Sequence, residues 1–233
     1  MARNQVSSAD KEGYSAMFAV HLIARLLLLS LSLVPRPPWS GLPSRTLTSG
    51  GIKGDPVNVA LEGTQARILA AFHAMGWVRA DPLSAKDDAR LAVDALFHRL
   101  YPTAPVSNLY LFHRPEDFAV EHELGSVARR DHARFWDTGR KDPGTGLELW
   151  IGDASQDIGI EILRRHHIPV GTTHRINPDV DAERANIVSG LRSTGMVVTM
   201  LTEPGMGAAT NAVNGGGDHF HTDGKVALIV LRQ

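Results

Sequence analysis

The chain has 233 residues, of which 43% are hydrophobic, enough to bury the core of one large domain or of one domain with an appendage. Its formal net charge of −1 at pH 7 argues against a nucleic-acid-binding protein, because phosphate neutralisation needs a basic surface. Cysteine is absent from the sequence, which excludes disulfides, thiolate zinc sites, iron–sulfur clusters and cysteine nucleophiles.

The first feature along the chain is the apolar segment Met17–Val34. As a helix its 18 residues would span about 27 Å, barely the thickness of a bilayer core, and His21 and Arg25 interrupt it. Three interpretations stay open: a single membrane anchor, which we favour, a secretory signal, or a buried helix. The first predicts a membrane-associated, single-pass protein whose orientation the flanking charges do not set. The others predict a secreted or a soluble protein.

The next segment, residues 35–54, is rich in proline, glycine, serine and threonine, which is typical of a linker. We therefore expect three parts: an N-terminal tail with a hydrophobic segment (1–34), the linker (35–54) and a folded domain (55–233).

The folded domain is expected to begin with a strand and two helices. Val57–Leu61 alternates like a strand. A helix should follow from Thr64, a good N-cap, to Gly76, a good C-cap. A second helix should begin at Ser84 and stop before Pro102.

A series of strands is expected next, before a third helix that begins near Asn177-Pro178 and ends at Gly195. Met196–Leu201 and Val226–Leu231 are apolar runs expected to be buried central strands. The earlier strand candidates are Leu109–His113, Phe118–His122, Asp131–Trp136, Leu147–Ile151 and Ile158–Ile162. This grouping predicts an α+β fold: a largely antiparallel sheet with three main helices, preceded by the N-terminal hydrophobic helix.

Several segments, in the same order along about 180 residues, resemble LssY C-terminal domains. They are Gly54–Asn58, Ala104–Phe112, Arg114–Ala119, Arg129–Trp136, Trp150–Ser155, Thr173–Arg184 and Thr222–Ala227. The resemblance implies a domain that is often joined to membrane-embedded DedA-like and type-2 phosphatidic-acid-phosphatase domains and has been labelled a secretion component. It implies no defined activity. The phosphatase motifs are absent here, so lipid phosphatase activity does not carry over.

The sharpest polar constellation is His174 followed by Asp179, Asp181, Glu183 and Arg184. One interpretation is structural, because acids in a first helical turn cap the helix and complement its dipole. The other is a divalent metal site of imidazole and carboxylate ligands, which would suit zinc, manganese or iron. The spacing matches no established metal motif, so helix capping is favoured.

A second polar group lies on the strand candidates before this helix. His132 and Arg134 should share one face of a strand, with Asp153 or Asp157 as partners of the arginine. We expect His132, Asp157, His174 and Asp181 to converge on one side of the sheet, either as metal ligands or as a structural network.

Two functions from different classes therefore stay open. The first is a membrane-anchored accessory or interaction module at the cell envelope, held on the membrane by residues 17–34, with an envelope protein or a lipid-related partner. The second is a metal-dependent hydrolase that uses the polar cluster. The sequence has no nucleophile elbow and no dinucleotide-binding glycine motif, which argues against an α/β-hydrolase and a Rossmann fold.

Overall fold

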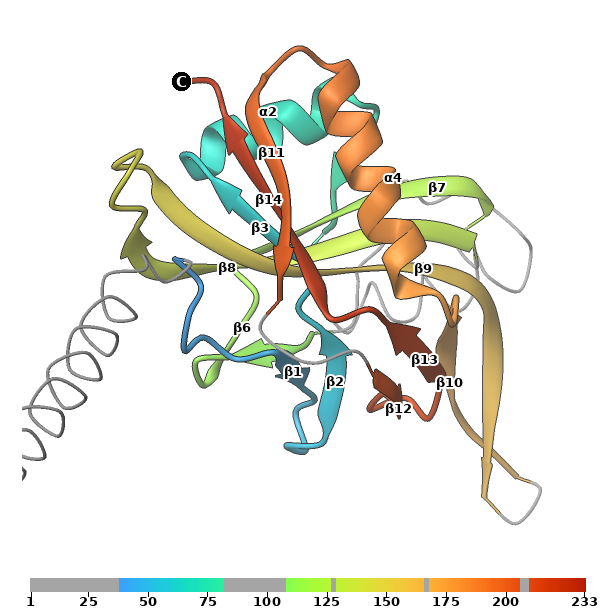
Figure 1. Ribbon diagram of the computed structural model, residues 1–233. Helices are drawn as coiled ribbons and strands as arrows, with labels where there is room; N and C mark the ends of the chain where they lie inside the picture. Colours follow the sequence, from blue (N-terminus) through green and yellow to red (C-terminus); the bar gives the residue numbers. More distant parts are fainter. Residues whose placement is uncertain (1–37, 82–107, 127–128, 166–167, 206–209) are drawn as a thin grey trace, which may run out of the picture. The chain divides into compact units, whose positions relative to one another are not determined.

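The long strands of an eight-stranded sheet form the centre of the fold (Figure 1). The computed structural model describes residues 38–81, 108–126, 129–165, 168–205 and 210–233. The sheet runs in the order β11 (Val197–Pro204), β14 (Lys225–Leu231), β3 (Val59–Glu62), β9 (Glu148–Arg165), β8 (Arg129–Lys141), β7 (Phe118–Ser126) and β4 (Val78–Arg79), and β10 (Ile168–Ile176) also pairs with β9. All neighbours are antiparallel except β14 and β3, which are parallel.

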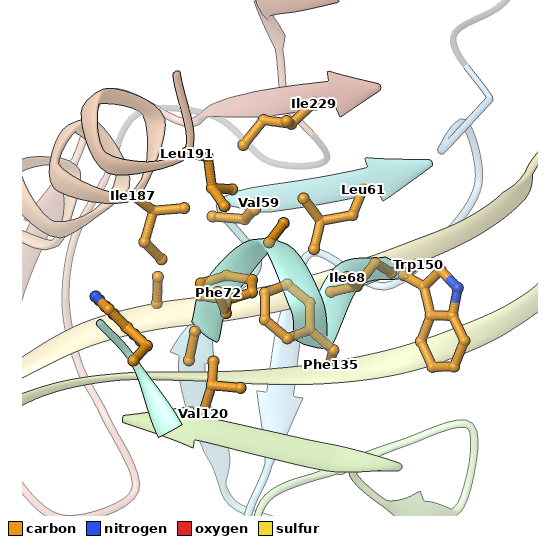
Figure 2. Packing of buried hydrophobic residues seen from close by; sticks show 14 of the residues in the cluster. Val59, Leu61, Ile68, Phe72, Val120, Phe135, Trp150, Ile187, Leu191 and Ile229 are labelled. Carbon is orange, nitrogen blue, oxygen red and sulfur yellow. The ribbon is translucent and has the colours of Figure 1, made fainter. Parts of the chain in front are cut away.

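Two helices pack against one face of this sheet. They are α2 (Gln65–Ala74) and α4 (Val180–Ser193). Phe72 of α2 and Ile187 and Leu191 of α4 join the buried side chains of the sheet in one core, which Figure 2 shows from close by. Phe135 contributes from β8, at 5.5 Å between ring centroids from Phe72. Burial of such side chains is the main stabilising contribution to a fold of this kind.

Two small sheets lie on the other side of the long strands (Figure 1). One has the order β2 (Lys53–Pro56), β1 (Arg45–Leu47), β5 (Tyr110–Leu111) and β6 (Arg114–Pro115); the other pairs β12 (Thr210–Val213) with β13 (His219–Thr222). A second apolar cluster fills this side and contains Trp39, Leu42 and Leu109 together with Trp136 of β8. The segment expected as a linker therefore contributes β1 and buried side chains, and the compact unit spans Pro38–Gln233.

The expected fold class is wrong. Strands dominate the described residues, which contain α2 and α4 but no third helix. The helix expected from Ser84 and the N-terminal hydrophobic helix at Met17–Val34 both lie outside the described residues. The strands are also longer than expected, because the single 18-residue strand β9 contains both Ile158–Ile162 and, except for Leu147, the run Leu147–Ile151. Polar residues between these two runs hid its continuity.

The two last apolar runs also differ from each other. β14 is a buried inner strand, as expected, whereas β11 lies at the end of the sheet order. Its Val197 and Met200 pack against the core and are only partly buried, and Val198 is 61% exposed. The expectation that Met196–Leu201 is a buried central strand is therefore wrong. In the described part of the chain, no helix has the length and hydropathy needed to cross a bilayer.

Candidate functional site

Buried polar side chains occupy part of the sheet face that lies opposite the helices. On β8, Arg130, His132 and Arg134 alternate with Asp131, Ala133 and Phe135, whose side chains face the helices. Their partners across the β8–β9 ladder are polar as well: Asp157, Ser155 and Asp153 respectively. Because paired residues of an antiparallel ladder share a face, the register places all six side chains on one surface. Further along the same face the ladder becomes apolar, where Trp136 pairs with Ile151.

The polar part of β9 lies where the sheet has a gap. β3 pairs with β9 up to Gly152, and β10 begins to pair with it at Asp157. The side chain of Asn58 fills the gap: its Oδ1 accepts from the Ala154 amide (2.9 Å) and its Nδ2 donates to the Ala154 carbonyl (2.9 Å). An amide side chain thus replaces the missing strand and keeps the backbone of β9 paired between the two neighbours.

Asp157 is the centre of the polar network. Its Oδ2 accepts from Arg130 Nε (3.0 Å) and lies 2.5 Å from His174 Nδ1, and its Oδ1 lies 3.1 Å from His132 Nε2. Arg130 also donates from Nη1 to Glu121 Oε2 (2.6 Å). The carboxylate on β9 therefore binds one imidazole and one guanidinium from β8 and one imidazole from β10, and it is only 2% exposed.

Arg134 is a second centre beside it. Its Nη1 donates to Asp153 Oδ2 (2.9 Å), lies 3.4 Å from His132 Nδ1 and lies 3.9 Å from Asp55 Oδ2. The Asp55 Oδ1 accepts in turn from Asn214 Nδ2 (3.0 Å) in the turn after β12. Among the described residues, Asp153 Oδ1 is buried without a hydrogen-bond partner. Arg134 therefore connects the long strands to Asp55 of β2. Asp55 in turn connects this group to the turn after β12.

Burial shifts the pKa values of this network in different directions. Burial lowers the pKa of His132, more than the neighbouring Asp157 raises it. Burial would raise the pKa of Asp157, but electrostatic attraction by the His132 and His174 rings and the hydrogen bonds from them hold that pKa well below its usual range. Burial raises the pKa of Asp153 to about 7 and that of Glu121 to about 8, against the attraction of their arginine partners.

These directions define the protonation of the centre at neutral pH. His132 is neutral and Asp157 is ionised. A neutral ring has one N–H, so His132 donates from Nε2 to Asp157 and accepts from Arg134 at Nδ1. His132 is thus fixed in one tautomer between two charged groups.

A cavity of about 270 Å³ opens onto this network. Its charged and titratable lining residues are Asp55, His132, Arg134, Asp157 and His174. Its other walls come from the β1–β2 turn, from Asn108 and from the glycine turn after β12. His174 is the most accessible of the network residues, with 20% of its side chain exposed against 2% for Asp157.

The contact of Asp157 with His174 has a clear chemical meaning. A carboxylate on Nδ1 orients an imidazole and fixes its tautomer, which leaves Nε2 as the nitrogen for proton transfer. Arg134, which lines the same cavity, can donate to a substrate oxygen. The cavity therefore contains the parts of a general acid–base site.

Glu183 lies on the opposite, helix-covered side of the sheet. It is 3% exposed, and its carboxyl group is hydrogen-bonded to that of Asp131. Asn186 donates to both carboxyl groups, at 3.2 Å in each case, and Gln156 donates to Asp131 at 2.8 Å. Burial and the nearby Asp131 raise the pKa of Glu183 to about 9, so it is protonated at neutral pH.

The remaining acids of the sequence cluster are structural contacts of α4. Asp179 caps the helix by accepting from the amides of Asp181 (3.1 Å) and Ala182 (3.2 Å). Asp181 accepts from the Asp223 amide (2.7 Å) and from Arg184 (2.9 Å). Arg184 also binds the carboxylate of Asp223, so this group fixes the turn between β13 and β14 to the helix.

The structure thus divides the nine candidate residues into three groups. His132, Arg134, Asp153, Asp157 and His174 share the network; Asp179, Asp181 and Arg184 lie at the start of α4; Glu183 lies behind the sheet. Within the described ranges, no three histidine, aspartate or glutamate side chains are arranged to hold a metal ion.

Sequence reasoning missed four residues of the site: Asp55, Asn108, Glu121 and Arg130. Two of them carried a usable signal. Arg130 lies two residues before His132 on the same strand, so alternation places both on one face. Glu121 lies on the preceding strand, which a short connection joins to β8. Asp55 and Asn108 come from distant segments, and no local pattern links them to this face.

Comparison with known proteins gives one match. A family model described as the LssY C-terminus matches residues 39–226, which include every strand that contributes to the polar network. No curated protein and no solved structure matches the chain. The match covers most of the sequence and confirms the resemblance found in its segments. The chain belongs to the LssY C-terminus family.

Proposed function

We propose that the cavity is the catalytic site of an enzyme that hydrolyses a neutral carboxylic ester, with His174 as the general base. The observation that carries this proposal is the contact between His174 Nδ1 and Asp157 Oδ2 (2.5 Å) at the wall of the cavity. The carboxylate is buried and oriented by Arg130 and His132, whereas the imidazole reaches the cavity.

The proposed reaction needs one proton shuttle. His174 takes a proton from a water molecule at Nε2 while the water oxygen attacks the ester carbonyl carbon. The bond to the leaving alcohol then breaks, and the imidazolium returns its proton to the alcohol oxygen. Asp157 stabilises the imidazolium through Nδ1–H. Arg134 donates to the carbonyl oxygen as negative charge develops on it.

The charge of the site supports an ester over a phosphate. Arg130 is matched by Asp157, and Arg134 lies between Asp55 and Asp153. The described network therefore has no excess positive charge, which a phosphate dianion would need. A neutral ester places only a developing charge beside Arg134.

The test is a pair of single-histidine variants assayed with 4-nitrophenyl acetate. His174→Asn should lower kcat by about 10²–10⁴-fold, the usual contribution of a general base. His221→Asn is the matched control, because His221 is exposed, lies 3.8 Å from the helix-capping Asp179 and does not line the cavity. Equal melting temperatures would show that both variants fold. Equal turnover in the two variants, or none in the unchanged protein, would contradict the proposal and favour a non-enzymatic module.

A metal-dependent version of the same hydrolysis is distinguished by elemental analysis. His132, Asp157 and His174 are suitable ligands for zinc, manganese or iron, and in this structure both imidazoles bind the carboxylate instead. Protein prepared without a histidine tag should be assayed before and after chelation with EDTA. Stoichiometric metal that is lost in His174→Asn, together with EDTA-sensitive turnover, would support the metal version.

We further propose that residues 17–34 hold the protein on a membrane at the cell envelope, where it acts on substrates or with partners near the bilayer. The support is the length and leucine content of the segment, which lies outside the described residues. Membrane fractionation tests this directly. Recovery of the full-length protein only in the soluble fraction would contradict it.

A further inference from the structure

Three exposed apolar residues lie next to residues that line the cavity. Eight large apolar side chains of the described residues are exposed, and three of them are Leu47 (39%), Ile52 (61%) and Val213 (45%). Leu47 and Ile52 flank the β1–β2 turn, and Val213 ends β12. A single exposed apolar residue is ordinary, but several around one opening mark a surface for a ligand or a partner.

Each of the three residues is directly connected to the cavity wall. Leu47 precedes Thr48, which lines the cavity, and the backbone of Ile52 bonds to Thr48 through its carbonyl (2.8 Å) and its amide (3.2 Å). Val213 precedes Asn214, another lining residue. The Val213 carbonyl oxygen accepts a hydrogen bond from the side chain of Arg45 on β1 (3.0 Å).

The two turns also pack against each other. A Cβ atom on Gly215 would lie 2.1 Å from Thr48 Cγ2, so only glycine fits between them. This close approach brings the turns that carry these apolar residues together beside the cavity, whose lining contains the charged network. The lining of the cavity is therefore charged, whereas the turns at its edge carry exposed apolar side chains.

The volume of the cavity limits what it can enclose. At about 30 Å³ per water-sized group, a cavity of about 270 Å³ holds on the order of nine such groups. An ester head group fits, whereas a longer chain attached to it must leave through the entrance. The first surface that it meets there is the apolar edge formed by Leu47, Ile52 and Val213.

Resting on the proposed ester hydrolysis, we propose that the substrate is a single-chain amphipathic ester. Its polar reacting group lies in the cavity against His174 and Arg134. Its apolar chain, of about six carbons or more, crosses the entrance and covers Leu47, Ile52 and Val213.

The experiment compares 4-nitrophenyl acetate, butyrate and octanoate at concentrations where all three are monomeric. In the unchanged protein, kcat/KM should rise about tenfold or more from acetate to octanoate, because full burial of one CH₂ group is worth about fourfold in affinity. The double variant Ile52→Ser, Val213→Ser should lose most of this increase from acetate to octanoate.

The matched control is Ile158→Ser, since Ile158 is also exposed (40%) and does not line the cavity. It should keep the full dependence on chain length. His174-dependent turnover that is equal for the three esters, or an increase that survives in the double variant, would overturn the inference while leaving the proposed hydrolysis intact.

A binding measurement separates the two proposals when turnover is absent. Calorimetric titration should show that octanoate binds at least tenfold more tightly than acetate, and that the double variant removes the difference while Ile158→Ser does not. If the unchanged protein shows no turnover that depends on His174, the proposed hydrolysis is overturned. Equal binding of octanoate and acetate overturns the amphipathic substrate, whatever the turnover.

Discussion

Replacing Glu183 with glutamine should make the stability of the protein less sensitive to alkaline pH. The Glu183 carboxyl group lies between α4 and the sheet, where it is hydrogen-bonded to Asp131 and is 3% exposed. The pKa of Glu183 rises from 4.5 to about 9 on folding, so the folded protein keeps a proton that the unfolded chain loses. Stability from this group is complete below the unfolded pKa and is lost as pH rises through the folded value.

The size of the effect follows from this shift. Between pH 6 and pH 9 the folded state, which keeps the proton, loses stability at about 1.36 kcal/mol per pH unit, roughly 4 kcal/mol over the whole interval as an upper value. Glutamine has no proton to lose, and its amide donates to Asp131 as the protonated carboxyl group does. The stability of the variant relative to the unchanged protein should therefore increase by about 2–4 kcal/mol between pH 6 and pH 9.

The assay is urea unfolding followed by tryptophan fluorescence, since all four tryptophans are buried. Other titrating groups are common to both proteins and cancel in the difference. Glu183→Ala is the control: it lacks a donor for Asp131 and should be less stable at both pH values. If the difference between Glu183→Gln and the unchanged protein varies by less than about 1 kcal/mol from pH 6 to pH 9, Glu183 is not protonated in the fold.

Three further predictions concern the site and its frame. Asp157→Asn should lower the free energy of unfolding by about 3–5 kcal/mol at pH 7, because it removes the charge opposite a buried guanidinium; a loss below about 1 kcal/mol in urea titration would contradict this. Gly215→Ala should cost about 1–3 kcal/mol through its clash with Thr48, and Thr48→Ser should relieve most of that cost in a double-mutant cycle. Pro38–Gln233 should melt cooperatively by itself, whereas a chain that starts at Asp55 should melt at a lower temperature in calorimetry, because it lacks β1.

Local signals in the sequence located the helices well. Thr64 caps α2 as predicted, with its hydroxyl accepting from the Arg67 amide at 3.3 Å. The helix near Asn177 is present as α4, although Asp179 caps it two residues later than the predicted start. Caps depend on neighbouring residues alone, which is why one sequence is enough to find them.

Long-range partners explain what the sequence did not predict. The polar stretch from Asp153 to Asp157 reads as a loop because nothing nearby shows that Arg130, Arg134 and Asn58 satisfy it. An apolar run such as β11 similarly reads as buried, although its place in the strand order leaves it exposed. Strand order and buried ion pairs are properties of the assembled sheet, so periodicity cannot supply them.

The parallel pairing of β3 with β14 sets a condition on how this protein folds. Val59 pairs with Ala227 at the far end of the domain, and β14 contributes Ile229 and Leu231 to the core beneath the helices. Closing so long a loop is entropically costly, so this contact should form late and the domain should fold slowly. During synthesis, the edge of β3 that pairs with β14 stays open until β14 leaves the ribosome. We therefore expect chaperone dependence and aggregation of nascent chains to concentrate in this interval.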